Sequence, residues 1–296
     1  MALRREGHRF HDGGLPPGGP RPDAPPRIEL ERLDQHGVET FALGRRLGYA
    51  DRHLGELLVP ADLATFRTDL TSVPALFTWL VPKTGAHLPA ALLHDGLVCD
   101  PADPTYLSVA GHVVDRVEAD RVFRDAMADT GTGVVRRWLV WSAVTTATLA
   151  TGQGTGWSTA RRWRYRLAVA LTVLVVVYLG ACATLDLVDV HVRGLVGLPW
   201  MGQRRWWLEV LGGLAAAVVV PFLLGLAWGR FRVAGVVLGI GLAVLLHVTV
   251  ALALLTGLYQ VAERAADRWP RPVALAGGAG VLVAAGVTVA LTLGLA

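Results

Sequence analysis

The sequence predicts an α+β protein in two parts: a small cytoplasmic domain that opens with a β-hairpin and further strand and continues with about four helices, then a bundle of four transmembrane helices. The chain has 296 residues, a mean hydropathy of +0.44 and 53% hydrophobic residues, which is too apolar for an ordinary soluble domain. Its long uncharged runs all lie in the second half, whereas alternating apolar and charged residues near the amino terminus indicate strands.

The amino-terminal 26 residues are rich in Pro and Gly and poor in apolar side chains. This composition predicts a disordered tail over residues 1–26. The tail carries charge but lacks an apolar centre, so it does not resemble a signal peptide. The α+β domain that follows, over residues 27–157, is therefore expected to stay in the cytoplasm.

Strand signals come first in this domain. Apolar and charged residues alternate around Leu30 and again over residues 38–43, on either side of a turn at His36-Gly37. Such a pattern predicts a β-hairpin. The apolar run 57–59, which Pro60 ends, predicts a further strand.

Helix signals follow the strands. Pro74, with Ser72 or Val73 as a cap, and Pro89 each fit the first turn of a helix, where proline needs no N–H partner. The uncharged part of the last apolar stretch is too short to cross a membrane, so it is expected to pack within the domain. The signals delimit four helices, over about 74–81, 89–97, 109–130 and 134–150.

Asp120 is conspicuous in the third of these helices. At about 100° per residue it falls in the middle of the apolar stripe of the helix. A carboxylate that is buried there must be paired or must bind a ligand. Two partners stay open from the sequence: a surface arginine, Arg116 or Arg124, or the preceding helix, which carries His94 and Asp95.

Four apolar runs are long enough to span a membrane, given the roughly 20 residues that a spanning helix needs. They cover residues 167–185, 210–228, 233–261 and 273–296. Tryptophans gather near their ends, where the headgroup layer favours amphipathic rings. The sequence thus predicts a multi-pass protein of the cell membrane, with the bilayer as its partner.

A basic juxtamembrane segment, residues 158–166, precedes the first run and carries four arginines: Arg161, Arg162, Arg164 and Arg166. Such a cluster favours the cytoplasmic side and anionic lipid. A nucleic-acid surface would need basic residues interleaved with aromatic ones on one face, so no nucleic acid is expected as a partner.

The chemistry of the domain centres on residues 68–95, with the adjacent His94-Asp95 pair at its end. Imidazole and carboxylate donors suit a divalent metal such as zinc or manganese, which would activate water for hydrolysis. The predicted ligands are Asp69, His94, Asp95 and Asp120, with His87 as a further acid-base candidate.

Two alternatives involve the same residues. Ser72 with His94 would make a serine hydrolase, although Ser72 stands where a helix cap is expected and no nucleophile-elbow motif surrounds it. Alternatively, Asp69 and Ser72 cap the helix that begins at Pro74, while His94 and Asp95 bond to the backbone in the core.

Six segments of the chain follow one another in an order typical of a known family: Tyr49, Val59-Pro60, residues 68–74, residues 90–95, residues 119–123 and Trp157. Over about residues 40–157 the chain resembles the uncharacterised, phage-associated family known as domain of unknown function 1353. The resemblance implies that the candidate residues belong to a shared pattern: Asp69, Ser72, Pro74, His94, Asp95 and Asp120. It implies no activity, because none is established for the family. The chain departs from the family at Val98-Cys99 and in its appended apolar runs.

A shorter segment, AALLHDGL over residues 90–97, also resembles the signature helix of HD-domain metal-dependent phosphohydrolases. That resemblance implies an upstream histidine ligand, His53 or His87, and Asp120 as a later one. The strands at the start of the domain do not suit that all-helical fold.

Two classes of function follow. The first is an integral membrane protein whose cytoplasmic domain is a metal-dependent hydrolase. The second is a non-enzymatic module of prophage origin that holds a protein partner, or a second copy in a homo-oligomer, at the membrane.

Overall fold

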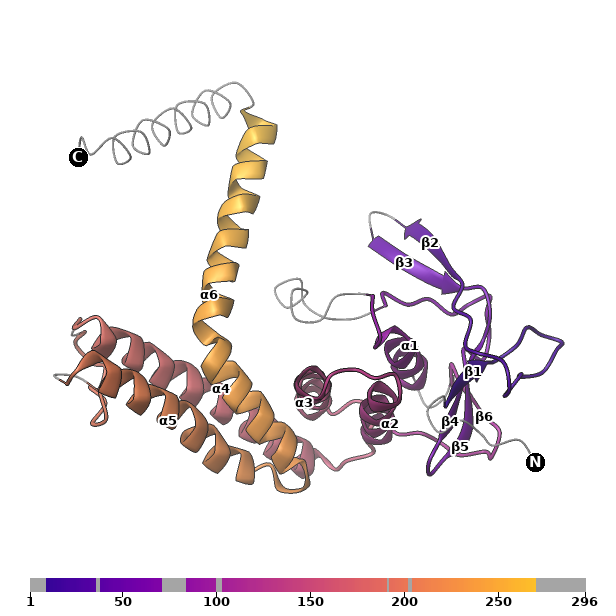
Figure 1. Cartoon of the computed structure of the whole chain (residues 1–296), viewed down its shortest axis with the longest axis horizontal. Coiled ribbons are helices and arrows are strands. Elements are labelled where there is room, and N and C mark those ends of the chain that lie inside the picture. Colours follow the sequence, from indigo (N-terminus) through magenta and orange to yellow (C-terminus); the bar gives the residue numbers. More distant parts are fainter. Residues whose placement is uncertain are drawn as a thin grey trace. The chain divides into compact units, whose positions relative to one another are not determined.

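The computed structural model describes residues 9–35, 38–70, 84–99, 103–190, 192–201 and 204–269. It has an α+β architecture with strands towards the amino terminus, as predicted (Figure 1). The chain divides into one compact unit up to Leu246 and a second from His247.

The strands form two separate antiparallel sheets. The larger sheet has the order β1-β4-β5-β6, and the smaller is the hairpin of β2 and β3, in which Leu30 pairs with Leu43. The predicted hairpin and the strand that ends before Pro60 are thus confirmed. The strands are β1 (Phe10–Asp12), β2 (Leu30–Gln35), β3 (Val38–Leu43), β4 (Leu47–Asp51), β5 (Gly55–Val59) and β6 (Leu107–Ser108).

The first strand, β1, corrects the prediction of a disordered tail over residues 1–26. Phe10 is buried and its ring lies 4.7 Å from that of Tyr49. Asp12 is buried as well and accepts two hydrogen bonds from Arg45, at 3.1 and 2.7 Å. Composition did not predict this strand because its pairing with β4, distant in sequence, holds it in the sheet.

Helices α1 (Leu88–Leu97), α2 (Arg116–Asp129) and α3 (Val134–Thr151) complete the domain. Helix α1 packs on β4 and β5, and α2 lies between α1 and α3 (Figure 1). The prediction that the second of these helices begins near residue 109 is wrong, because residues 107–108 pair with β5 and Asp115 caps the helix. The helix predicted at 74–81 and the turn at 36–37 lie outside the described residues.

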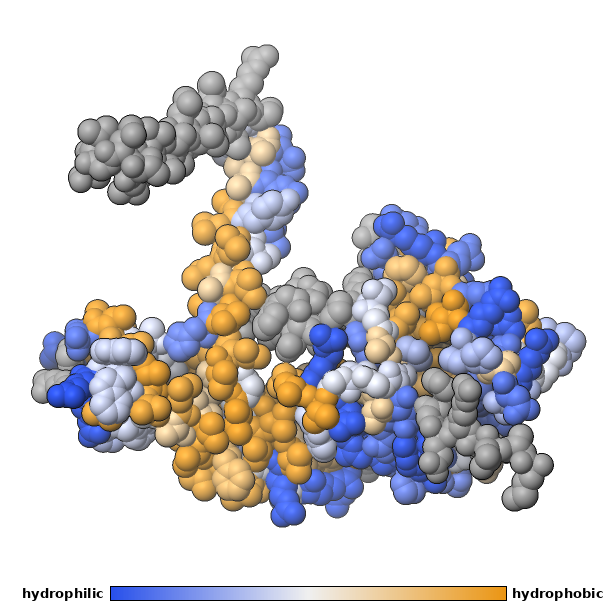
Figure 2. Space-filling model, viewed as in Figure 1, coloured by the Kyte–Doolittle hydropathy of each residue, from blue (hydrophilic) through white to orange (hydrophobic). Residues whose placement is uncertain are grey.

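Three helices of the described chain are long and apolar enough to cross a membrane: α4 (Thr159–Leu187), α5 (Trp206–Leu226) and, after the short 3₁₀ turn η2 (Gly229–Phe231), the first part of α6 (Arg232–Arg268). Hydrophobic side chains cover their surfaces (Figure 2). Three of the four predicted spans thus have a counterpart. The fourth, 273–296, lies outside the described residues.

The small residues of α5 and α6 allow these helices to pack closely. A Cβ added at Gly225 would lie 2.6 Å from the backbone nitrogen of Val236. Trp228 is fully buried beside this contact and donates through its indole nitrogen to the Thr172 hydroxyl on α4, at 3.0 Å. Helices α4, α5 and the start of α6 therefore form one packed group.

Candidate functional site

The centre of the helical layer is a buried polar network that links three helices. The imidazole Nε2 of His94, on α1, lies 3.0 Å from Oδ1 of Asp120 on α2. The second carboxylate oxygen of Asp120 accepts a hydrogen bond of 2.7 Å from the hydroxyl of Thr148 on α3. His94 is 8% exposed, Asp120 2% and Thr148 not at all. The imidazole also stacks on Phe123, with the ring centroids 4.6 Å apart.

This geometry settles which partner Asp120 uses. Of the two that the sequence left open, the structure places Asp120 against His94, while Arg124 binds Asp125 at 2.9 Å. An ionised carboxylate only accepts hydrogen bonds, so it requires the proton on Nε2 of the imidazole. The basic nitrogen of a neutral His94 is then Nδ1, and Asp120 fixes both the tautomer and the ring orientation.

Asp95, the next residue on α1, faces a different partner. Its carboxylate accepts a hydrogen bond of 2.5 Å from the hydroxyl of Thr68. The same hydroxyl accepts from the amide of Leu70, whose φ of 69° lies in the left-handed region. Two backbone hydrogen bonds to Phe41 anchor Thr68 beside β3. The turn after Thr68 therefore aims its hydroxyl at α1.

Burial sets the protonation behaviour of Asp95. Burial raises the pKa of this carboxyl above its ordinary value of 3.8, against the opposing effects of the Thr68 hydrogen bond and of His94. The charge of Asp69 raises the pKa further. Asp69, His94 and Asp95 are thus electrostatically coupled, and a perturbed carboxyl beside a histidine is typical of functional sites.

The predicted metal ligands do not form a ligand set. Among the residues that the structure describes, no group of three or more His, Cys, Asp or Glu side chains is arranged to hold a metal ion. Asp120 is committed to His94 and Thr148, and Asp95 to Thr68. The donor arrangement therefore does not fit the predicted zinc or manganese ion.

The remaining candidates lie in several places. His87 is buried at the N-cap position of α1, and Ser72 lies outside the described residues. His53 is exposed in the turn between β4 and β5. That position, together with the antiparallel sheet, does not agree with an HD-domain phosphohydrolase.

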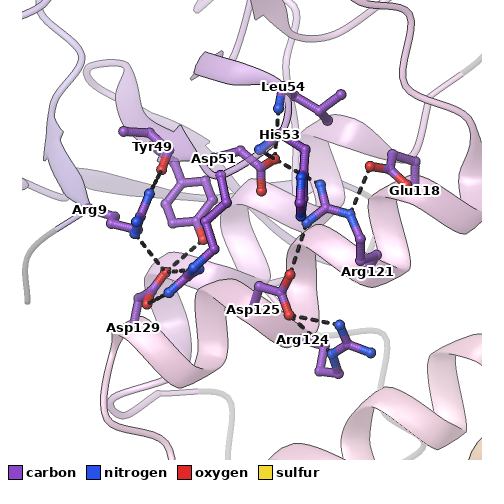
Figure 3. Close-up of polar contacts among 12 residues, drawn as sticks. Arg9, Tyr49, Asp51, His53, Leu54, Glu118, Arg121, Arg124, Asp125 and Asp129 are labelled. Carbon is purple, nitrogen blue, oxygen red and sulfur yellow. Dashed lines mark hydrogen bonds and ion pairs between the residues drawn. The ribbon is translucent and has the colours of Figure 1, made fainter.

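A second cluster of charges joins the sheet to α2 (Figure 3). Asp51 accepts hydrogen bonds from Arg121 at 2.8 Å and from the amides of His53 and Leu54, both at 2.9 Å. Burial alone would raise the pKa of Asp51, but these hydrogen bonds outweigh it and hold the pKa below its ordinary value. Arg121 also binds two carboxylates on its own helix, at i−3 and i+4. The cluster braces the β4–β5 turn against α2.

The sequence alone did not reveal this brace. The spacing of Glu118, Arg121 and Asp125 is visible in the sequence as a helical charge pattern. The partner on the sheet, Asp51, is 70 residues away from Arg121, and nothing in its local sequence marks it.

Asp95→Asn is expected to raise the unfolding temperature of the full chain at neutral pH. Burial disfavours the charged form of this carboxyl, and an amide of the same shape carries no charge that must lose water. A carboxyl whose pKa is raised by folding contributes stability that is complete below its unfolded pKa and is lost as the pH rises through the folded pKa. As the pH is raised from about 4, the unfolding temperature should therefore fall less for D95N than for the wild type. An equal fall in both chains would contradict this assignment.

Fold and site together define an α+β domain with a buried His–Asp pair, followed by three helices of membrane-spanning length. Residues 41–144 match the model of the family described as "Protein of unknown function (DUF1353)", less than half of the chain. The predicted resemblance is confirmed over those residues. No curated protein and no solved structure matches the chain.

Proposed function

We propose that the chain is a membrane-anchored hydrolase in which His94 removes a proton from the attacking water. The observation that carries this proposal is the 3.0 Å contact between His94 and Asp120, which is itself held by Thr148. A general base that is oriented by a third group is the arrangement that activates water or hydroxyl nucleophiles. Asp120 acts through His94 and is a positioning residue.

Asp95 is the proposed proton donor to the leaving group. Burial shifts its pKa upward, which makes protonation easier, and it is adjacent to His94 on α1. We derive no step through a metal ion, because the described donors do not fit one.

The proposed location is the cell membrane, crossed several times, with the amino-terminal domain on the cytoplasmic side. Helices α4, α5 and α6 have the length and composition for this. The four arginines between 161 and 166 support the cytoplasmic side, since basic residues flanking the first span favour it.

The test is turnover of chromogenic phosphate and carboxylate esters by the full chain in lipid nanodiscs. We expect His94→Ala to lower the rate by about 10²–10⁴-fold, the usual contribution of a general base. His53→Ala removes an exposed histidine from the same domain and should leave the rate unchanged. Folded H94A with wild-type turnover would overturn the proposal. Turnover is also measured for Ser72→Ala and, in another experiment, for the wild type with a chelator. A loss of turnover in S72A would indicate a serine nucleophile, and a loss with the chelator would indicate a metal.

The second candidate is a non-enzymatic module that holds a protein partner, or a second copy of this chain, at the membrane. It is favoured by the mutual pairing of Asp120 with His94 and Thr148, all buried, which a structural core also requires. Under this alternative His94→Ala lowers the unfolding temperature, and no ester is turned over by either chain. A folded, monomeric wild-type chain that hydrolyses esters would contradict it.

A further inference from the structure

Two basic segments that are far apart in the sequence meet at one end of the group formed by α4, α5 and the start of α6. An aromatic cluster joins them: Tyr165 on α4 lies 4.8 Å from Trp157 and 5.3 Å from Phe231 of η2, between ring centroids. Trp228 strengthens the junction through its hydrogen bond to Thr172. The start of α4 and the turn between α5 and α6 therefore present their arginines together.

Two of these arginines fasten the backbone. Arg166 donates to the carbonyls of Ala150 and Thr151 at the end of α3, both at 2.7 Å. Arg162 donates to the carbonyl of Trp157 at 3.2 Å. Their guanidinium groups hold the domain to α4 and are largely occupied by these contacts.

Four further arginines are exposed: Arg161, Arg164, Arg230 and Arg232. Within the part of the chain that the structure describes, none of them has a carboxylate at ion-pair distance. The guanidinium of Arg230 lies 4.7 Å from the Phe231 ring centroid, and that of Arg164 lies 5.7 Å from that of Tyr165. Arg164 also reaches the η2 turn, where a nitrogen of its guanidinium would lie 3.2 Å from a Cβ added at Gly229.

An arginine stacked on an aromatic ring keeps its N–H groups, which lie in the guanidinium plane, available for an anion. Phosphate is the anion that this planar fork binds best. The cluster stands at the ends of helices with the length and composition of membrane spans, beside the exposed Trp163. Tryptophan prefers the headgroup layer, so the available guanidinium groups lie where lipid phosphates are found.

We propose that Arg164 and Arg230, assisted by Arg161 and Arg232, bind the phosphate of an anionic phospholipid in the leaflet next to the domain. Phosphatidylcholine offers the same phosphate beside a trimethylammonium group, which the uncompensated arginines repel. The site therefore selects lipids with a net negative charge. Binding would brace α4 against η2 and thereby stabilise the junction between the domain and the membrane helices.

The experiment titrates the detergent-solubilised full chain with dihexanoyl phosphatidylglycerol and follows its unfolding temperature. We expect a saturable rise with this lipid and none with dihexanoyl phosphatidylcholine. R164Q/R230Q should bind phosphatidylglycerol about 30-fold more weakly, since each arginine near an anionic headgroup contributes roughly fivefold. R136Q/R193Q removes two exposed arginines elsewhere and should bind like the wild type. R166Q should unfold at a lower temperature with its lipid affinity unchanged.

Three results would overturn the proposal. The first is wild-type affinity in R164Q/R230Q. The second is an equal loss in R136Q/R193Q, which would show a general charge effect. The third is inorganic phosphate binding as tightly as the lipid, which would show a soluble-anion site. Should R164Q/R230Q not fold, R161Q/R232Q leaves the aromatic contacts of Arg164 and Arg230 intact and must itself weaken lipid binding for the proposal to stand.

Discussion

Asp120→Ala is expected to lower the free energy of unfolding by about 2–6 kcal/mol, because it removes the acceptor of two buried hydrogen-bond donors. The substitution leaves Nε2 of His94 and the hydroxyl of Thr148 without their acceptor in the buried interior of the domain. Each orphaned polar group costs about 1–3 kcal/mol. The unfolding temperature of the full chain in detergent measures the loss.

The matched control is Asp125→Ala, on the same helix and one and a half turns away. Its carboxylate binds Arg121 and Arg124 near the surface, with 20% of the side chain exposed. Partly exposed ion pairs contribute about 1 kcal/mol or less, so this variant should unfold close to the wild-type temperature. Thr148→Val, which removes one donor and keeps the shape, should fall between the two. Equal losses in D120A and D125A would show that the network does not stabilise the domain.

Part of this network could be predicted from the sequence, and part could not. Helical phase placed Asp120 on the buried face of its helix, and the neighbouring helix offered His94 as a partner. Thr148 was not predicted, because it is one of several threonines in an apolar run and only the packing of α3 on α2 selects it. Thr68 was not predicted as the partner of Asp95 either. Its hydroxyl is oriented by the turn at Leu70 and by a bridge to β3, which the local sequence does not reveal.

The two halves of the chain differ in how well pattern alone predicts them. A bilayer requires every backbone group of a span to bond within its own helix, so length and hydropathy suffice to find α4, α5 and the first part of α6. The sheet depends on partners distant in sequence. Strand β1, only three residues long, exists because β4 pairs with it, and β6 exists because β5 does. Local patterns, an alternation for the hairpin and an apolar run ended by Pro60 for β5, found only these strands.

Gly96→Ala is expected to destabilise the domain by about 2–3 kcal/mol, although alanine favours a helix over glycine by about 1 kcal/mol. The substitution is destabilising, in spite of the helix preference for alanine, because α1 contacts β5 closely at this position. A Cβ at Gly96 would lie 2.1 Å from Cγ1 of Val59 and 2.9 Å from Cγ2. Val59 is fully buried, so its methyl groups cannot move out to solvent. The helix must therefore move away from the sheet, and α1 carries both His94 and Asp95 with it.

A double-mutant cycle with Val59→Ala isolates this clash. Val59→Ala alone should cost about 2 kcal/mol because it leaves a cavity, but it also makes room for the added methyl group at residue 96. The double variant should then be more stable than the sum of the two losses predicts, by about 1 kcal/mol or more. Gly257→Ala is the control: in α6 an added Cβ meets no described atom within 4 Å, so stability should hold or rise. If the two losses of unfolding free energy simply add, α1 does not need a glycine at residue 96 to approach the sheet. The position of His94 would then be fixed by the contacts with α2 alone.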